Sequence, residues 1–271
     1  MRIGVFGTIH ASNRTVPKPP SLASQMTDHA QPPLPADRPP GRVWLIGAGP
    51  GAADLITVRG ARILASAEVV LHDALVTPEM LALCPQALQI AVGKRGGRQS
   101  TAQASINEQL VDCARSHARV VRLKGGDPML FGRADEELRA LEAAGIAYEV
   151  IPGITTALAA AAACKLPLTR RGVSRSVAFF TSSTDPSEPG ATDMPIADTI
   201  VQYMGGREAI QTARRLLAAG HAPGTPVVVV ENCSLPSERI QHLDLAGLET
   251  GLDTGNGPVL VMIGAALARR A

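Results

Sequence analysis

The chain has 271 residues, of which 45% are hydrophobic and 18% are charged, and its formal net charge is +2. This length and composition are typical of one large folded domain or two smaller ones. The small net charge gives no general attraction to nucleic acid or to anionic membranes. Aromatic residues make up only 3% of the chain, which is few for a protein that stacks nucleic-acid bases. We therefore expect no nucleic-acid partner and no membrane partner.

The cysteines do not suggest metal or disulfide chemistry. They are widely separated and form no Cys-x-x-Cys pair; the four are Cys84, Cys113, Cys164 and Cys233. This spacing fits neither a zinc site nor a disulfide framework, so we expect no metal and a reducing, cytoplasmic location. No apolar run approaches the ~20 residues that a membrane-spanning helix needs.

The first 41 residues differ from the rest of the chain. They contain eight prolines and show no hydrophobic period. Such a segment buries too little apolar surface to offset the entropy of ordering. Residues 1–41 are therefore predicted to form a proline-rich disordered tail.

From residue 43 onward, short apolar runs alternate with helical patterns. In order, the expected elements are strand 43–46, helix 57–67, strands 69–71 and 87–92, helix 100–117, strand 119–123, helix 134–144, strand 148–151 and an alanine-rich helix after Gly153. Thr57 is a suitable N-cap for the first helix. This alternation predicts an α/β sheet of parallel strands with helices on both faces.

A second unit begins near residue 168 and is richer in strand. Its expected elements are strands 176–180, 199–204, 226–230, 239–243 and 258–263, with helices 207–219 and 244–248. Because it has fewer long helices, we expect a mixed sheet. With the alanine-rich helix counted in the second unit, the predicted domains are 42–156, an N-terminal α/β domain, and 157–271, a C-terminal one. A cleft between two such domains is a common place for a small molecule.

A glycine-rich turn, Gly47–Gly51 (GAGPG), follows the first strand. A turn at this place either binds a ligand, as in a dinucleotide-binding fold, or is an ordinary tight turn. Pro50 weakens the first interpretation, because it removes a backbone N–H from a turn that would hold a pyrophosphate. Taken alone, the motif leaves both interpretations open.

The residues after other predicted strands likewise have either a ligand-binding or a purely structural role. The turn Lys124–Pro128 (KGGDP) has two glycines that admit a ligand close to the backbone, and Asp127 either binds ribose hydroxyls or caps the next element. Thr155 or Thr156 can cap the alanine-rich helix. Met204, before two glycines, is either a core residue or a residue placed over a ligand.

Two charged residues also follow predicted strands. Asp73 comes just after strand 69–71, and Lys94 follows strand 87–92. The carboxyl ends of strands are where α/β sheets place their chemistry. For each residue alone, a solvated surface charge is the commoner explanation.

Taken in chain order, these segments resemble the tetrapyrrole methylases, and within them the uroporphyrinogen-III C-methyltransferases. The resemblance covers the chain from residue 43 to its end. The segments that carry it are GAGPG at 47–51, DALV at 73–76, VGKRGG at 92–97, VVRLKGGDPMLFGR at 120–133, VIPGITTALAA at 150–160, LPLTRRG at 166–172 and YMGG at 203–206.

The resemblance implies an α/β, two-domain tetrapyrrole methylase fold (class III methyltransferase) with the cofactor in a cleft between the domains, and a homodimer. It implies that S-adenosylmethionine (AdoMet) methylates uroporphyrinogen III at C2 and C7, giving precorrin-2 for cobalamin or sirohaem, with no metal. Asp73 would be the proton acceptor and Lys94 the proton donor. The implied AdoMet contacts are Pro50, Gly125, Gly126, Asp127, Leu130, Thr155, Thr156, Met204 and Cys233.

These residue types suit the chemistry. Alignment of the pyrrole carbon with an activated methyl can contribute about 7–11 kcal/mol in favourable cases, and a carboxylate can take the proton that the ring then loses. The substrate's carboxylates favour arginine partners; the candidates are Arg95, Arg98, Arg170 and Arg171.

The chain departs from the family pattern at three places. Ala74 replaces an arginine, Ser182-Ser183 replaces Gly-His, and Cys233 replaces a glycine. Ala74 has no charge with which to bind a substrate carboxylate, so this chain lacks the contact that an arginine would make at that position.

Three other functions compete with this one. They are methylation of a later precorrin, non-catalytic binding of AdoMet or a tetrapyrrole, and a Rossmann-type oxidoreductase. Asp73 and Lys94 argue against the second, and Pro50 argues against the third.

Overall fold

The computed structural model describes residues 39–92, 103–182 and 194–269. All but the last three residues of the predicted tail, 1–41, fall outside these ranges. Within the described residues, no helix is both long and apolar enough to cross a membrane.

The first sheet is entirely parallel, as the sequence predicts. Its strand order is β3-β2-β4-β1-β5. The strands are β1 (Arg42–Gly47), β2 (Val69–His72), β3 (Leu88–Ala91), β4 (Arg119–Lys124) and β5 (Tyr148–Ile151). Each predicted strand of this unit is present, to within one or two residues at either end.

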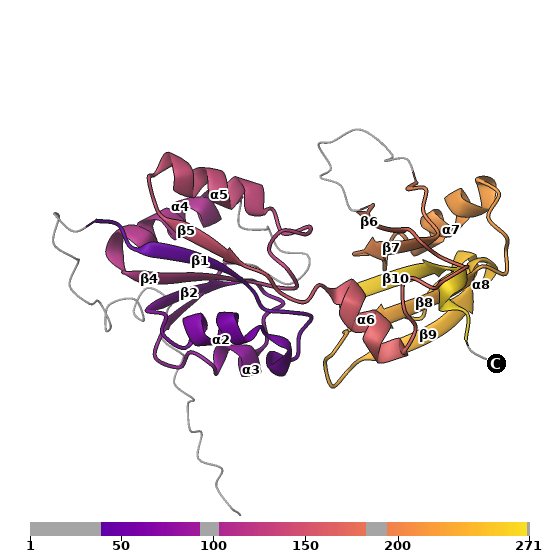
Figure 1. The fold of residues 1–271 in the computed structure, drawn as a ribbon, viewed down its shortest axis with the longest axis horizontal. Helices are drawn as coiled ribbons and strands as arrows, with labels where there is room; N and C mark the ends of the chain where they lie inside the picture. Colours follow the sequence, from indigo (N-terminus) through magenta and orange to yellow (C-terminus); the bar gives the residue numbers. More distant parts are fainter. Residues whose placement is uncertain (1–38, 93–102, 183–193, 270–271) are drawn as a thin grey trace, which may run out of the picture. The chain divides into compact units, whose positions relative to one another are not determined.

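Helices cover both faces of this sheet (Figure 1). On one face lie α4 (Gln103–Ser116) and α5 (Ala134–Ala143), and on the other lie α2 (Val58–Leu64) and α3 (Pro78–Leu81). Burial on both faces explains why β1 and β2 read as nearly continuous apolar runs. In β4, only Arg119 is exposed. Three short elements were not expected: α3 and the 3-10 helices Ala53–Leu55 and Ala265–Leu267. Each has only three or four residues, which is too short for a hydrophobic period to appear in the sequence.

The second sheet is mixed, which confirms the expectation for this unit. Its order is β6-β7-β10-β8-β9, and of its four strand pairs only β6 with β7 is parallel. The strands are β6 (Val177–Thr181), β7 (Thr199–Tyr203), β8 (Pro226–Glu231), β9 (Arg239–Asp244) and β10 (Val259–Gly264).

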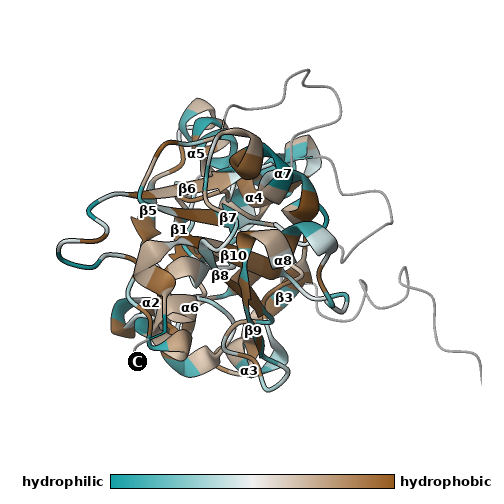
Figure 2. Cartoon of the chain, turned by 90° about the vertical axis from the view of Figure 1, so that its right-hand side faces the viewer, coloured by the Kyte–Doolittle hydropathy of each residue, from teal (hydrophilic) through white to brown (hydrophobic). Residues whose placement is uncertain are grey.

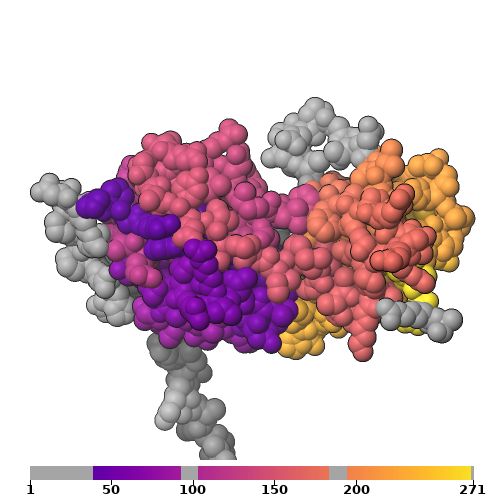
Figure 3. All heavy atoms as spheres, viewed as in Figure 1, coloured from indigo at the N-terminus to yellow at the C-terminus, as the bar shows by residue number. Residues whose placement is uncertain are grey.

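This sheet also has helices on both faces. Helix α6 (Thr156–Cys164) covers one face, and α7 (Ala209–Ala218) and α8 (Leu245–Thr250) cover the other. The central strand β10 is buried at all six positions. It is coloured as hydrophobic in Figure 2, and little of its yellow reaches the face shown in Figure 3.

A threonine side chain caps the N-terminus of α2 but not that of α6. The hydroxyl of Thr57 accepts the backbone N–H of Gly60 at 3.1 Å, so the predicted cap of α2 is confirmed. Thr155 is the N-cap residue of α6, but its hydroxyl makes no capping bond. It instead hydrogen-bonds the Tyr203 hydroxyl at 2.5 Å.

The strand order creates a topological switch point in the first sheet. Strands β1 and β4 are neighbours, yet α2 follows β1 on one face and α5 follows β4 on the opposite face. The two chain segments therefore diverge at the carboxyl edge of the sheet. Ligands of open α/β sheets bind at such a point, and both predicted glycine-rich turns lie there.

Candidate cofactor and substrate site

The two glycine-rich turns are joined directly by backbone hydrogen bonds. Gly49 donates to the Gly126 carbonyl at 3.1 Å, and Gly126 donates back to Gly49 at 2.7 Å. Ala48 adds a bond to the Lys124 carbonyl at 2.7 Å. The turns after β1 and β4, separate in sequence, thus form one unit at the switch point.

A third segment, after β5, lies against this unit. A Cβ atom on Gly153 would stand 2.2 Å from the Gly126 carbonyl oxygen and 2.7 Å from the Gly47 Cα. Only a residue without a side chain allows this approach. The carboxyl ends of β1, β4 and β5 are therefore packed backbone to backbone.

The Asp127 side chain fixes the arrangement. Its Oδ1 accepts the backbone N–H of Met129 at 2.8 Å, and its Oδ2 accepts the backbone N–H of Gly153 at 2.9 Å. The bond to Met129 is local and agrees with the interpretation of Asp127 as a residue that caps the next element. The second bond is long-range and connects the turn after β4 to the segment after β5.

The N–H groups of the first turn argue against a pyrophosphate site. Ala48 and Gly49 donate to carbonyl oxygens, Pro50 has no N–H, and Ala52 donates to the Ser234 hydroxyl at 2.9 Å, which leaves the Gly51 N–H for a ligand. A pyrophosphate needs such groups unpaired. The dinucleotide-binding interpretation of GAGPG is therefore not supported by this geometry.

Other candidate residues come from the second sheet. Met204 follows β7, has a left-handed φ of 55° and is 51% exposed. The preceding Tyr203 bonds Thr155 and accepts the Ala157 N–H at 3.1 Å. Phe131 packs against the Tyr203 ring with centroids 5.0 Å apart. Burial raises the Tyr203 pKa, which keeps this phenol neutral.

Cys233 lies in the turn after β8. It is buried, and its neighbours Asn232 and Ser234 have φ values of 53° and 64°. Left-handed backbone in non-glycine residues is uncommon and often marks functional sites. Ser234 also accepts the Ala52 N–H, so this turn is tied to the segment that carries Pro50.

Asp73 stands just beyond the end of β2, where it was predicted. Its side chain is 31% exposed, and its Oδ1 accepts a hydrogen bond from Arg122 Nη2 at 2.5 Å. Its backbone N–H donates to the Leu123 carbonyl at 3.3 Å. The carboxylate is thus held on one side by a cation and is open on another.

Several candidates cannot be placed. Lys94, Arg95, Arg98 and Ser183 lie outside the described residues. Arg170 and Arg171 are exposed and belong to a short turn in which Arg170 pairs with Ser174. Ser182, at a departure from the family pattern, accepts a bond from Gln202 at 3.0 Å.

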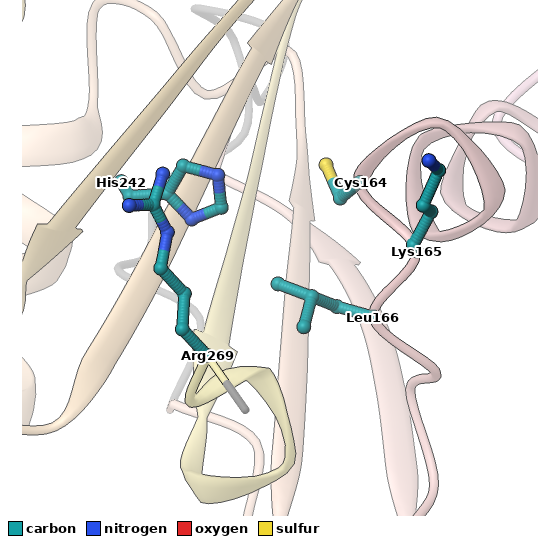
Figure 4. A pocket seen from close by; sticks show the side chains of 5 residues that line it. All are labelled: Cys164, Lys165, Leu166, His242 and Arg269. Carbon is teal, nitrogen blue, oxygen red and sulfur yellow. The ribbon is translucent and has the colours of Figure 1, made fainter. Parts of the chain in front are cut away.

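Two surface cavities lie elsewhere. One, of about 420 Å³, is lined by Cys164, Lys165, Leu166, His242 and Arg269. Figure 4 shows Cys164 and Leu166 on one side of it, with His242 and Arg269 on the other. Burial, and secondarily Arg269, lowers the pKa of His242. The second cavity lies along α4 and α5, and no candidate site residue lines either one. Among the described residues, no cluster of histidine, cysteine and acidic side chains could hold a metal ion.

The buried pair of Arg122 with Glu137 was not predicted from the sequence. Arg122 Nε donates to Glu137 Oε1 at 3.0 Å, and both side chains are almost inaccessible. A signal was present, because Arg122 lies inside the predicted strand 119–123 and Lys124 directly follows it, in a sheet expected to have helices on both faces. Buried cations require a buried acidic partner.

The fold and the joined glycine turns define an α/β protein that presents a ligand site at the carboxyl edge of a parallel sheet. Residues 42–249 match the family model described as Tetrapyrrole (Corrin/Porphyrin) Methylases. The chain belongs to this family of methyltransferases.

Similar proteins narrow the assignment. A uroporphyrinogen-III C-methyltransferase of Pseudomonas aeruginosa is 42% identical over 228 residues, which cover 83% of this chain and 93% of that protein. A siroheme synthase of Edwardsiella ictaluri is 41% identical over 247 residues, 89% of this chain but 53% of the relative. The chain thus spans about half the length of such synthases.

Solved structures agree. Uroporphyrin-III C-methyltransferase from Thermus thermophilus, in complex with S-adenyl homocysteine, is 38% identical with a TM-score of 0.74, over 84% of this chain and 93% of that one. A cobalt precorrin-4 methyltransferase is 28% identical with a TM-score of 0.71, over 84% and 96% of the two chains. The two-domain tetrapyrrole methylase fold that the sequence predicts is confirmed.

Proposed function

We propose that this chain transfers methyl groups from AdoMet to C2 and C7 of uroporphyrinogen III, giving precorrin-2 for cobalamin or sirohaem. The observation that carries the proposal is the joining of three strand-end segments at the switch point, with Asp73 at the same edge of the sheet. The substrate named for the Pseudomonas relative, and the S-adenyl homocysteine in the Thermus complex, support the two reactants.

AdoMet would lie against residues of both sheets. Open space adjoins the Cα of Gly126, where an added Cβ would meet no atom within 4 Å, so a ligand can approach the backbone there. Bound AdoMet supplies a methyl group activated by a positively charged sulfur. The residues assigned to hold it are Pro50, Gly125, Gly126, Asp127, Leu130, Thr155, Thr156, Met204 and Cys233. No metal is required.

Asp73 is assigned as the proton acceptor. Its Oδ1 is held by Arg122, so we assign Oδ2 as the oxygen that takes the proton lost by the tetrapyrrole after methylation. Partial exposure of this side chain lets a substrate reach it. Lys94 is assigned as the proton donor.

The substrate's carboxylates need cationic partners at the mouth of the site. Arg170 and Arg171 are exposed, and we assign them, with Arg95 and Arg98, to this role. Reversing the charge at Arg170 is expected to raise the KM for the tetrapyrrole and to leave AdoMet affinity nearly unchanged. A change in AdoMet affinity alone would rule out this role.

The assembly and location are also proposals. The expected organisation is two domains, at 42–156 and 157–271, with the cofactor cleft between them, and a homodimer of such chains. A cytoplasmic location is supported by the four cysteines, which are all free thiols. A reducing compartment keeps thiols in this state.

Release of S-adenosylhomocysteine tests the proposal. Purified protein is incubated anaerobically with AdoMet and uroporphyrinogen III, and two S-adenosylhomocysteine molecules are expected for each tetrapyrrole consumed. The likeness to a cobalt precorrin-4 methyltransferase makes a later precorrin the second candidate substrate. Release only with a later precorrin would select that candidate. If the protein binds AdoMet but releases no S-adenosylhomocysteine with any tetrapyrrole tested, it is a non-catalytic binding protein.

A further inference from the structure

A buried chain of four charges leads from Asp73 into the protein. Asp73 Oδ1 meets Arg122, Arg122 meets Glu137, and Glu137 meets Lys124. The side chains of Arg122, Glu137 and Lys124 are 3%, 0% and 3% exposed. The two carboxylates and the two cations balance one another, and only Asp73 reaches the surface.

Arg122 is buried and makes four hydrogen bonds within the protein. Its Nε donates to Glu137, its Nη2 donates to Asp73, and its Nη1 donates to the carbonyl oxygens of Leu123 at 3.2 Å and Leu71 at 3.5 Å. Because this side chain is only 3% exposed, a substrate carboxylate has little access to it. Among the partners of Arg122, Asp73 is the one that reaches the surface, so the route from Arg122 to the reaction runs through Asp73.

Glu137 holds the guanidinium in a single orientation. Besides Arg122, it accepts from Lys124 Nζ at 2.9 Å and 3.0 Å and from Gln103 Nε2 at 3.3 Å. Its partners come from β4 and α4, while Glu137 itself is on α5. Burial, with nearby Arg122 as a second cause, lowers the Lys124 pKa, so the ammonium is costly to keep there. Buried ion pairs seldom add net stability, but the hydrogen bonds of this one hold the Arg122 guanidinium between Glu137 and Asp73.

We propose that Arg122, oriented by Glu137, is a positioning residue that fixes the Asp73 carboxylate for proton abstraction. The inference rests on the proposed function, in which Asp73 accepts the proton. The charged or titratable groups around Asp73 in the described residues are Arg122 and Lys124 from β4, Glu137 from α5, and His72, whose Nδ1 lies 3.1 Å from the Asp73 carbonyl oxygen. Of these, Arg122 alone is hydrogen-bonded to the Asp73 carboxylate.

The first test is a double-mutant cycle on kcat for methylation of uroporphyrinogen III. Arg122→Met is expected to lower kcat about 100-fold, the scale of a misplaced catalytic group. The kcat of Arg122→Lys is expected to lie between those of Arg122→Met and the unchanged protein, because lysine keeps the charge but not the planar guanidinium. In an Asp73→Asn background, Arg122→Met should change kcat less than about twofold, since the effect passes through Asp73. AdoMet affinity should not change.

Independent, multiplying losses in the cycle would overturn the proposal. Such a result would mean that Arg122 supports the fold in general and not Asp73 in particular. Arg122→Lys serves if Arg122→Met does not fold, because it preserves the buried cation.

The second test does not depend on activity. The Nε–H proton of Arg122 is buried and bonded to Glu137, so its NMR signal, identified by its loss in Arg122→Lys, should exchange slowly with water. Glu137→Gln should abolish or strongly broaden the signal. The matched control is Glu142→Gln, the same change at an exposed position of α5, which should leave it intact.

The two tests separate the two claims. If the protein does not methylate uroporphyrinogen III but Glu137→Gln removes the Arg122 signal, the proposed function fails and the fixed orientation of Arg122 stands. If the signal survives Glu137→Gln, Glu137 does not orient Arg122 and the inference is overturned, whatever the substrate.

Discussion

The Asp127 carboxylate accepts the backbone N–H of Gly153 at 2.9 Å and so joins the segments that follow β4 and β5. Its other oxygen accepts the N–H of Met129 at 2.8 Å. Both oxygens thus act as acceptors for backbone donors. An amide in this place would turn an NH₂ group toward one of those donors.

Asp127→Asn is therefore expected to destabilise the fold and the site together. Loss of one hydrogen bond to this half-buried carboxylate costs about 1.5–3 kcal/mol in the free energy of unfolding, and AdoMet affinity should fall with it. Denaturant unfolding and calorimetric titration with AdoMet measure the two effects. Asp135→Asn, at a side chain that is 74% exposed, is the control and should change neither. Unaltered AdoMet binding in Asp127→Asn would show that this bond does not shape the site.

Gly153→Ala should separate the packed strand ends. The new methyl would stand 2.2 Å from the Gly126 carbonyl oxygen, so the backbone must move. We expect AdoMet affinity to fall at least about tenfold, which corresponds to 1.4 kcal/mol. Gly224→Ala is the matched control, because a Cβ there meets nothing within 4 Å. Equal AdoMet affinities for the two variants would contradict the close packing described at Gly153.

Tyr203→Phe tests the connection between Thr155 and the second sheet. The substitution leaves the Ala157 N–H and the Thr155 hydroxyl without their partner, which should cost about 1–3 kcal/mol of unfolding free energy. Tyr148→Phe is the comparison, since that hydroxyl bonds Glu142 at the surface. Its melting temperature should not change. Similar melting temperatures for both variants would show that the buried hydroxyl contributes nothing.

The cysteines should resist alkylation near neutral pH. Burial raises the pKa of Cys113 and Cys164 to about 11 and that of Cys233 to about 12. Because only the thiolate reacts, raised values mean fewer reactive groups at pH 8, and reactivity should rise as the pH approaches 11. Mass analysis after iodoacetamide treatment should find these three unmodified in the folded protein and modified after unfolding. Fast labelling of Cys233 at pH 8 would contradict this.

Much of the fold could be predicted from the sequence. Strands buried on both faces read as apolar runs, and Thr57 marked the start of α2. The helix α3 was missed because four residues show no period, although Pro78 after Thr77 is a helix-start signal. Local pattern therefore sufficed wherever an element was long enough to repeat.

The site was less predictable because its bonds are long-range. The sequence placed Asp73 and Asp127 at strand ends, but it could not show that Asp127 reaches Gly153 or that Asp73 meets Arg122. These contacts depend on the strand order, which brings β4 beside both β1 and β2. Thr155 illustrates the same limit: the sequence offers Thr155 or Thr156 as the N-cap, whereas the bond of Thr155 to Tyr203 comes from packing.

The measurement that bears most directly on the proposed function is the mass of the tetrapyrrole after anaerobic incubation with AdoMet and uroporphyrinogen III. The unchanged protein should add two methyl groups, and Asp73→Ala should add none or do so far more slowly while still binding AdoMet. A tetrapyrrole that stays unmethylated in the presence of protein that binds AdoMet would contradict uroporphyrinogen III as the substrate.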